Sequence, residues 1–238
     1  MISKLVHGRN EEVTRLEGFS DAVFAFAMTL LVVSLEAPVT FEDLLADMRG
    51  FFAFGICFGA LVLIWYWHYV FFRRYALPTT PVLVVLNAVL LFVVLLYVYP
   101  LKFLFTYLVD EFAGFANGVR LPDGTVVPAI APEQMPPLLV IYGIGFVAVS
   151  LTFALLYCYA YRKRGELGLS KVEIHETRDS IQTQLVSVGV GLTSIAIAVI
   201  GGTSMSNLAG WSYVYLLVPL QIVHGFVMGR RKSRFEQE

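Results

Sequence analysis

Seven polar side chains interrupt long apolar runs of this sequence, and their types are those that move protons or bind metals and other ions. They are Asp21, Thr29, His68, Asn87, Gln182, Gln184 and His224. Carboxylate and imidazole groups can relay protons or coordinate metals, whereas hydroxyl and amide groups can line a hydrated path. Which chemistry is available depends on the elements that hold these groups, and first on whether the apolar runs cross a membrane.

The composition indicates that lipid is part of the solvent of this chain. Of its 238 residues, 58% are hydrophobic and 15% are charged, and the mean hydropathy is +0.73. An ordinary globular domain carries roughly 25% charged residues. The net charge of -1 excludes a basic nucleic-acid-binding domain, and the two cysteines, Cys57 and Cys158, fit neither a disulfide framework nor a zinc site. The sequence therefore predicts an all-α integral membrane protein.

Six apolar runs reach the length of about 20 residues that a helix needs to cross the hydrocarbon core. They occupy residues 18–37, 51–72, 81–107, 137–161, 181–203 and 211–229. Because most of the connections are short, we expect one six-helix transmembrane domain over residues 1–238. The long connection at 108–136 is rich in Gly and Pro and predicts an irregular extracytoplasmic loop, with a hairpin at Asp123-Gly124.

Three segments beside these runs carry more local predictions. Residues 38–50 predict a short amphipathic helix on the outer surface. The charged segment 162–180 is helical in pattern and predicts extensions of the fourth and fifth spans into the cytoplasm. Pro100 predicts a kink in the third span or the point where that span leaves the membrane.

The distribution of basic residues predicts the orientation of the spans. If the N-terminus is inside and the chain crosses six times, all but three of the 17 Lys and Arg residues lie on the cytoplasmic side. The exceptions are Arg49, Lys102 and Arg120. Such a bias is the positive-inside signal of membrane proteins. Five or seven spans would scatter the basic clusters over both faces, so we expect six spans with both termini in the cytoplasm.

Three of the polar residues are expected at one depth, near the cytoplasmic ends of the first three spans. Asp21 lies at the start of the first span, His68 near the end of the second, and Asn87 within the first two turns of the third. Asp21 is either an interfacial carboxylate stabilised by the helix N-terminus or a buried group paired with Arg15 and His68. The sequence leaves both interpretations open.

The first span carries an uncharged stripe. Ala22, Phe26, Thr29 and Val33 recur at helical spacing, with Leu30 beside them, and only Thr29 is polar. A helix–helix contact explains this pattern, because Ala and Thr are common at helix interfaces in membranes. The functional alternative is a pore wall whose apolar side chains gate by dewetting.

Enzymatic and cofactor chemistry find little support in the sequence. His68 and His224 could in principle ligate a haem, but each stands alone in its span, and we expect no cofactor and no metal site. No phosphate-binding loop, nucleophile elbow or zinc-protease motif occurs, and a carbonyl potassium filter is absent too. We therefore expect no enzyme and no catalytic residues.

The segment Arg15-Leu16-Glu17-Gly18-Phe19-Ser20-Asp21 resembles the Arg-x-x-x-Phe-Ser-Asp signature of the transmembrane protein 175 family. Trp65-Tyr66-Trp67-His68 looks like the Trp-x-x-His element of that family, and Asn87 and Pro100 fit as well. The family consists of potassium-permeable channels of endosomes and lysosomes, with prokaryotic relatives. The resemblance covers the first three spans, and the last three agree in number and length.

The resemblance implies a homotetramer of single six-helix repeats in a prokaryotic plasma membrane, with the first helices lining a central pore for monovalent cations. It implies an apolar constriction in place of a carbonyl filter, and a preference for potassium. It maps the constriction to Phe26, Leu30 and Val33 and a polar layer to Thr29. It also implies a structural network around the first helix, made of Arg15, Phe19, Ser20, Asp21, Trp65, His68 and Asn87. This chain carries Phe26 where the family usually has Ile or Leu.

Two functions of other classes compete with a channel. A proton-coupled carrier would use Asp21 and His68 as a relay, and a membrane scaffold would transport nothing. Carriers often show inverted repeats and helices broken at mid-membrane. No repeat is visible in this sequence, and Asp21 and His68 are expected near one face of the membrane. A pH-dependent exchange that Asp21→Asn abolishes would favour the carrier, and ion-impermeable vesicles with a folded protein would favour the scaffold.

Overall fold

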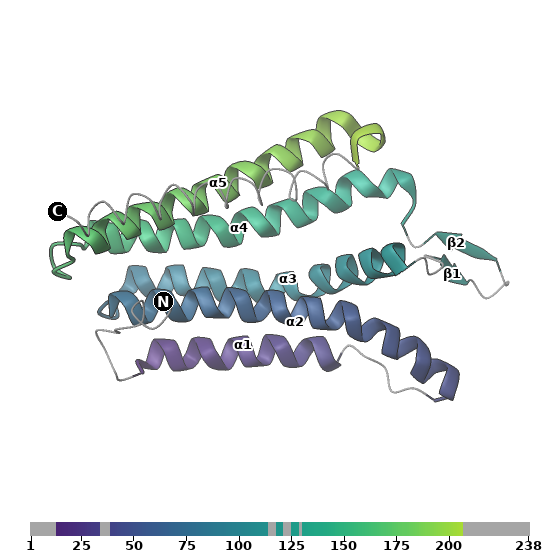
Figure 1. Ribbon diagram of the computed structural model, residues 1–238, viewed down its shortest axis with the longest axis horizontal. Helices are drawn as coiled ribbons and strands as arrows, with labels where there is room; N and C mark the ends of the chain where they lie inside the picture. Colours follow the sequence, from purple (N-terminus) through teal and green to yellow (C-terminus); the bar gives the residue numbers. More distant parts are fainter. Residues whose placement is uncertain (1–12, 34–38, 114–117, 121–124, 129, 207–238) are drawn as a thin grey trace. The chain divides into compact units, whose positions relative to one another are not determined.

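The computed structural model describes residues 13–33, 39–113, 118–120, 125–128 and 130–206. The long helices in these ranges are α1 (Arg15–Val33), α2 (Phe41–Tyr75), α3 (Pro81–Ala113), α4 (Met135–Arg162) and α5 (Lys171–Gly201), shown in Figure 1. The short 3-10 helices η2 (Pro132–Gln134) and η3 (Gly202–Met205) precede α4 and follow α5. The predicted all-α fold is confirmed, and the strands of the structure are limited to one small hairpin among the described residues.

The chain divides into two compact units. Of the described residues, those within 13–72 and 91–132 form one unit, called here the α1–α2 unit, and those within 73–90 and 133–206 form the other, the α4–α5 unit. Both α2 and α3 continue without a break from one unit into the other. A helix that belongs to both units is a covalent link between them.

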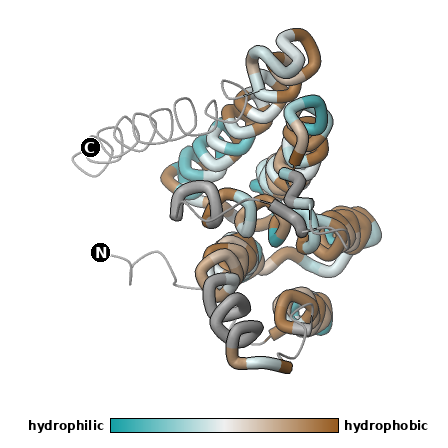
Figure 2. The backbone as a smooth tube through the Cα atoms, turned by 90° about the vertical axis from the view of Figure 1, so that its right-hand side faces the viewer, coloured by the Kyte–Doolittle hydropathy of each residue, from teal (hydrophilic) through white to brown (hydrophobic). Residues whose placement is uncertain are grey.

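Four of the described helical segments are long and apolar enough to cross a membrane. They are Gly50–Tyr75, Pro81–Val109, Pro132–Arg162 and Lys171–Met205. Each coincides with one of the predicted spans from the second to the fifth. Figure 2, which views the helices nearly end-on, shows many hydrophobic residues in them. α1 covers the first predicted span up to Val33, while residues 34–37 and the sixth predicted span, 211–229, lie outside the described residues. The chain is an integral membrane protein.

The prediction of a short helix over residues 38–50 is confirmed for the helical state from Phe41 onward, but the helix is not short, because it continues into the second span. α2 is a single helix of 35 residues that begins at Phe41 and passes through Gly50 without a break. A helix interior tolerates one Gly at a cost of about 1 kcal/mol relative to Ala. Ending one helix and starting another would leave backbone groups unsatisfied at both new ends, which costs more. Continuity of the helix is therefore the cheaper solution.

α3 also extends further than the sequence predicts. It continues past Pro100 and ends at Ala113, so the proline does not end the helix and the predicted loop at 108–136 begins later. Proline removes one backbone donor, and the remaining hydrogen bonds on both sides hold the helix together. Beyond α3, β1 (Gly118–Arg120) pairs antiparallel with β2 (Val126–Pro128), with Val119 opposite Val127. These strands confirm the predicted hairpin, whose turn at Asp123-Gly124 lies outside the described residues.

α4 and α5 pack along one another as an antiparallel pair (Figure 1). The buried face of α5 contains small residues, namely Ser187, Gly191, Ser194 and Ala198. A Cβ atom on Gly191 would lie 2.6 Å from Val147 Cγ2, so this glycine allows the two helices to approach closely. α5 begins at Lys171, which confirms the predicted extension of the fifth span, whereas α4 stops at Arg162.

A capping box starts α5. The Ser170 side chain accepts a hydrogen bond from the Glu173 backbone N–H, and the Glu173 carboxylate accepts one from the Ser170 backbone N–H. In the turn before it, Gly168 has φ 56°, a left-handed conformation that glycine adopts without steric cost. The local sequence therefore reverses the chain between α4 and α5.

Candidate functional site

The signature segment of the sequence forms the first turns of α1, and a second capping box holds its start. The Thr14 backbone N–H donates to Glu17 Oε2 at 2.8 Å, and the Glu17 backbone N–H donates to Thr14 Oγ1 at 3.2 Å. Glu17 is thus the capping residue of the signature, a role that the sequence analysis missed. The signal was present, because Thr-x-x-Glu before an apolar run is the standard spacing of a capping box.

One face of α1 packs into the α1–α2 unit. Ser20, Phe24, Ala27 and Leu31 recur at spacings of four, three and four residues, and each is at most 1% exposed. At 3.6 residues per turn these positions form one stripe along the helix. The Phe24 ring lies against His68 of α2, with ring centroids 5.6 Å apart. This stripe is the face through which α2 supports α1.

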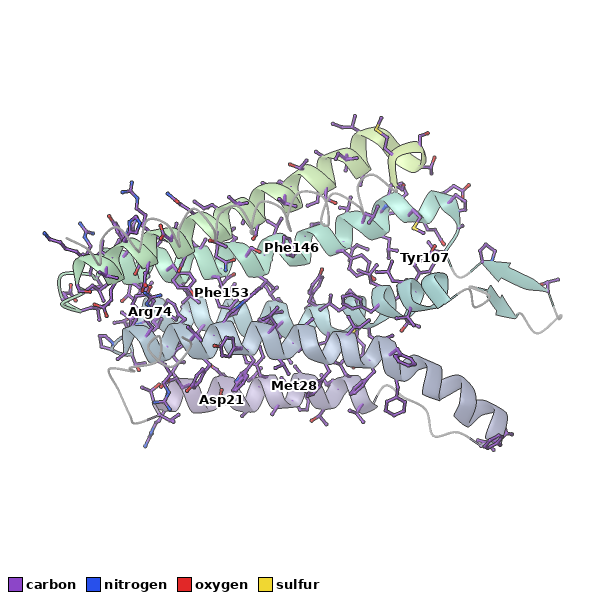
Figure 3. The ribbon with its side chains drawn as sticks, viewed as in Figure 1. Asp21, Met28, Arg74, Tyr107, Phe146 and Phe153 are labelled. Atoms are coloured by element: carbon purple, nitrogen blue, oxygen red, sulfur yellow. The ribbon has the colours of Figure 1, made fainter. Side chains whose placement is uncertain are left out.

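Asp21 has a different partner from the two that the sequence suggested. The Trp65 indole Nε1–H donates a hydrogen bond to Asp21 Oδ1 at 2.8 Å, and Asp21 is exposed on the single chain (Figure 3). Among the described residues, Arg15 and His68 make no ion pair with it. Asp21 follows the buried Ser20, and one residue rotates a helical side chain by about 100°. That rotation brings the carboxylate to the edge of the α1–α2 contact, within reach of the indole.

The other polar residues of the predicted network are buried. His68 is 1% exposed, and its ring centroid lies 4.5 Å from that of Phe72. Ser20 is 0% exposed, and its hydroxyl donates to the Leu16 carbonyl at 2.8 Å. Asn87 is also buried, on the part of α3 that belongs to the α4–α5 unit. Arg15 and Phe19, in contrast, are exposed on the single chain. The residues of the predicted network therefore divide into a buried set, Ser20, His68 and Asn87, and a set exposed on the single chain, which includes Arg15 and Phe19.

The predicted stripe of α1 forms its outward face. Ala22, Phe26 and Thr29 are exposed, and Phe26 retains 57% of its accessible surface. At about 100° per residue, these positions lie opposite the stripe that contacts α2. Leu30 is half-buried beside them, and Val33 lies in the last turn of the helix, with a side chain outside the described set.

The chemistry of this outward face is apolar with a single hydroxyl. Thr29 Oγ1 donates to the Ala25 carbonyl at 2.9 Å, so the hydroxyl proton is used within the helix. The oxygen keeps lone pairs that can accept from water or contact a cation. From Ala22 to Val33 no ionisable side chain occurs. In the part of the chain that the structure describes, no group of three or more His, Cys, Asp or Glu residues could hold a metal ion.

A second polar cluster lies in the α4–α5 unit, where the sequence analysis predicted none. Arg74, at the end of α2, forms an ion pair with Glu176 of α5 (Figure 3 labels Arg74). The next residue, Tyr75, shares a hydrogen bond of 2.7 Å with Thr177. The only sequence signal was the charge pattern at these helix ends, because partners 102 residues apart are joined by the fold alone.

Two further contacts of the same unit lie near the C-terminal end of α4. In the connection between α2 and α3, the Thr80 and Tyr159 hydroxyls lie 2.7 Å apart, which ties this connection to α4. On the turn after α4, Lys163 Nζ lies 2.7 Å from Glu166 Oε1 on the surface. The hydrogen bond from Lys163 to the Glu166 carboxylate raises the pKa of the Lys163 ammonium above its ordinary value. The first contact joins separate elements, whereas the second stays within one turn.

Long apolar helices, an uncharged outward face on α1 and polar contacts at the helix ends define a multi-span membrane protein whose first helix is held from one side. The chain belongs to the TMEM175 family. The family model described as endosomal/lysosomal potassium channel TMEM175 matches residues 15–97, which contain the predicted signature elements of α1, α2 and α3. The resemblance seen in the sequence is thereby confirmed.

Individual relatives extend the likeness over almost the whole chain. The chain is 41% identical over 233 residues to a potassium channel from Marivirga tractuosa, covering 97% of this chain and 93% of that protein. It is 28% identical over 195 residues to a potassium channel from Chamaesiphon minutus, covering 79% of this chain and 83% of that protein. The crystal structure of a variant of the potassium channel MtTMEM175, in complex with a nanobody-MBP fusion protein, superposes with a TM-score of 0.80. It is 39% identical and covers 94% of this chain and 97% of that chain.

Proposed function

We propose that this chain forms a potassium channel whose ion path is lined by the outward face of α1. The observation that carries the proposal is the division of α1 into a face packed on α2 and an opposite face that is exposed and uncharged. A helix that is apolar all round needs neighbours or lipid on every side. Relatives named as potassium channels support the choice of ion and make an enzyme an unsuitable class.

We propose a homotetramer with the four α1 helices around a central axis. One α1 supplies only one wall, so a closed path requires several copies, and copies of one chain assemble most often with closed symmetry. Each chain would contribute a single six-helix domain over residues 1–238, with both termini in the cytoplasm. The bias of the basic residues supports that orientation. The proposed location is the plasma membrane of a prokaryote.

Selection and gating would occur at apolar side chains. Phe26, Leu30 and Val33 are the proposed constriction, and Thr29 is the proposed polar layer. A ring of apolar groups gates by excluding water, and the faces of Phe rings attract cations. The Thr29 oxygen would then offer a contact to a partly dehydrated ion. A separate network would hold the helix in place without touching the ion; it consists of Arg15, Phe19, Ser20, Asp21, Trp65, His68 and Asn87.

A carrier with an Asp21/His68 relay has less support. The Asp21 carboxylate accepts from Trp65, and the His68 ring packs between Phe24 and Phe72. A proton relay needs donor and acceptor within hydrogen-bond reach of each other or of a shared water. Among the described residues, no direct hydrogen bond joins the two groups.

The test is ion flux from liposomes that contain the purified protein, with potassium and then sodium as the permeant ion. Phe26→Ala should raise the flux and reduce the preference for potassium, because a smaller side chain widens and wets the constriction. Phe92→Ala is the matched control, since Phe92 is also an exposed phenylalanine, but on α3. An unchanged flux in Phe26→Ala, with the oligomer intact, would remove α1 from the ion path.

A further inference from the structure

We propose that the N-terminal segment of α5 positions α1 through α2, with Glu176 and Thr177 as its positioning residues. The inference rests on the proposed function for its effect on conduction. Its structural part concerns only which contacts hold α1, and can be tested separately. Both residues are far along the chain from α1, and neither belongs to the signature segment.

The first step is the attachment of α5 to the end of α2. Two consecutive residues of α2 are held by two consecutive residues of α5, Arg74 by Glu176 and Tyr75 by Thr177. The side chains of the ion pair are only 19% and 22% exposed, and Tyr75 is fully buried. Charges that are shielded from water interact more strongly than exposed ones. This pair of contacts is named here the α2–α5 clasp.

The second step runs along α2. His68, Phe72 and Tyr75 follow one another at spacings of four and three residues, which places them in one row on the helix. All three are at most 5% exposed, and the rings of His68 and Phe72 are in contact. Tyr75 continues the row to Tyr157 of α4, with ring centroids 6.1 Å apart. The clasp therefore holds the end of the unbroken helix that carries these buried rings.

The third step is the contact of that row with α1. His68 packs on Phe24, and Trp65, one turn earlier on α2, donates to Asp21. A helix rises 1.5 Å per residue, so Trp65 and Arg74 lie about 14 Å apart along an unbroken helix. A helix of this kind transmits rotation and shift as a nearly rigid element. Releasing its end from α5 should thus free α1 to move.

The competing interpretation is a clasp that only stabilises the α4–α5 unit. Both interpretations predict a less stable protein when the clasp is broken. They differ in the response of α1, because only a positioning role changes the mobility of α1 and the preference between ions at its outward face.

The experiment compares Glu176→Gln and Tyr75→Phe in the full-length protein in liposomes. Tyr75→Phe removes the hydroxyl and keeps the buried ring, so it tests the clasp even if loss of the ion pair in Glu176→Gln prevents folding. The charge swap Arg74→Glu with Glu176→Arg is the rescue variant. Glu166→Gln is the matched control, because Glu166 also pairs with a basic residue but within the exposed turn after α4. Two readouts are recorded, amide hydrogen exchange of α1 and the potassium-to-sodium flux ratio.

We expect faster exchange in α1 and a change of about fivefold in the flux ratio for Glu176→Gln, the size that a partly exposed ion pair can supply. The charge swap should restore both readouts, and Glu166→Gln should leave both at the parent values. Exchange that rises only in α5, with an unchanged flux ratio, would overturn the proposal. Faster exchange in α1 together with an unresponsive Phe26→Ala would keep the positioning role and reject α1 as the ion path.

Discussion

The α1–α2 contact and the α4–α5 contact differ in the side chains that meet there, although both contain hydroxyls that bond to their own helix. Between α1 and α2 the Asp21 carboxylate accepts from the Trp65 indole and the His68 ring lies against Phe24, whereas the Ser20 hydroxyl donates to the Leu16 carbonyl of its own helix. In α5 the hydroxyls of Thr177, Ser180 and Ser187 donate to carbonyls four residues earlier in their own helix, and Thr177 also shares a hydrogen bond with Tyr75 of α2. A polar residue in a membrane helix therefore does not by itself mark a functional path.

The difference lies in what each helix must bury. α5 carries small residues on its buried face, so its backbone approaches α4 closely. A hydroxyl that bonds to a carbonyl of its own helix lies close to the helix backbone and leaves room for this approach. α1 is held from one side by rings, and the opposite face stays exposed. Thr29 makes the same bond to its own helix as the hydroxyls of α5, yet it lies on that exposed face. The exposure of a polar side chain, rather than its residue type, therefore distinguishes a candidate for the ion path from a residue that only packs between helices.

The largest effect should follow from breaking the close α4–α5 contact. Gly191→Leu would place side-chain atoms where Val147 and Phe146 already lie, and we expect a loss of stability of about 1–3 kcal/mol from overpacking. Gly189→Leu is the control, because no heavy atom lies within 4 Å of a Cβ at that position. Thermal unfolding in detergent measures both. Equal melting temperatures would show that small residues do not set the distance between these helices.

An intermediate effect should follow from breaking the polar link between α1 and α2. Trp65→Phe removes the donor to the Asp21 carboxylate, and a hydrogen bond to a charged group contributes about 1.5 kcal/mol at the lower end of its range. A double-mutant cycle with Asp21→Ala isolates the pair, and Tyr66→Phe controls for a change at an exposed neighbour. Additive losses would mean that the two side chains do not stabilise each other.

The smallest effects should come from the two capping boxes, and we expect the same loss of stability at both. Thr14→Ala at α1 and Ser170→Ala at α5 each remove a cap, at a cost of about 1 kcal/mol. Because the contacts are local, both changes should increase amide exchange only in the first turn of their own helix. Thr14→Ser should retain the cap. A much larger response at α1 than at α5 would reveal a tertiary role of Thr14 in the signature segment.

Much of the fold could be predicted from the sequence, because it depends on local patterns. Apolar runs of sufficient length predicted the four spans that the structure describes, and Asp-Gly between short extended segments predicted the hairpin. The sequence predicted a short helix up to residue 50 and a span from residue 51, and α2 joins the two, since helix continuity depends on backbone hydrogen bonds and not on hydropathy. Pro100 likewise interrupts the hydrogen bonding of α3 without ending it.

The candidate site could be predicted only in part. The stripe of Ala22, Phe26 and Thr29 follows from helical periodicity, and the structure places it on an exposed face. The partner of Asp21 did not follow, because Trp65 is 44 residues away in the chain and the helix rotation decides which side chains meet. The α2–α5 clasp could not be predicted either, since opposite charges 102 residues apart have many possible partners.

The sequence by itself determined that this chain is an integral membrane protein with an uncharged stripe on its first helix, and its motifs indicated the TMEM175 family. The membrane class and the stripe reside in composition, in periodicity and in backbone hydrogen bonds that each helix makes within itself. Only the tertiary structure decided which stripe packs on α2, which indole binds Asp21 and which helix holds Arg74 and Tyr75. Contacts between distant segments depend on the relative rotation of packed helices, and no local pattern encodes that rotation.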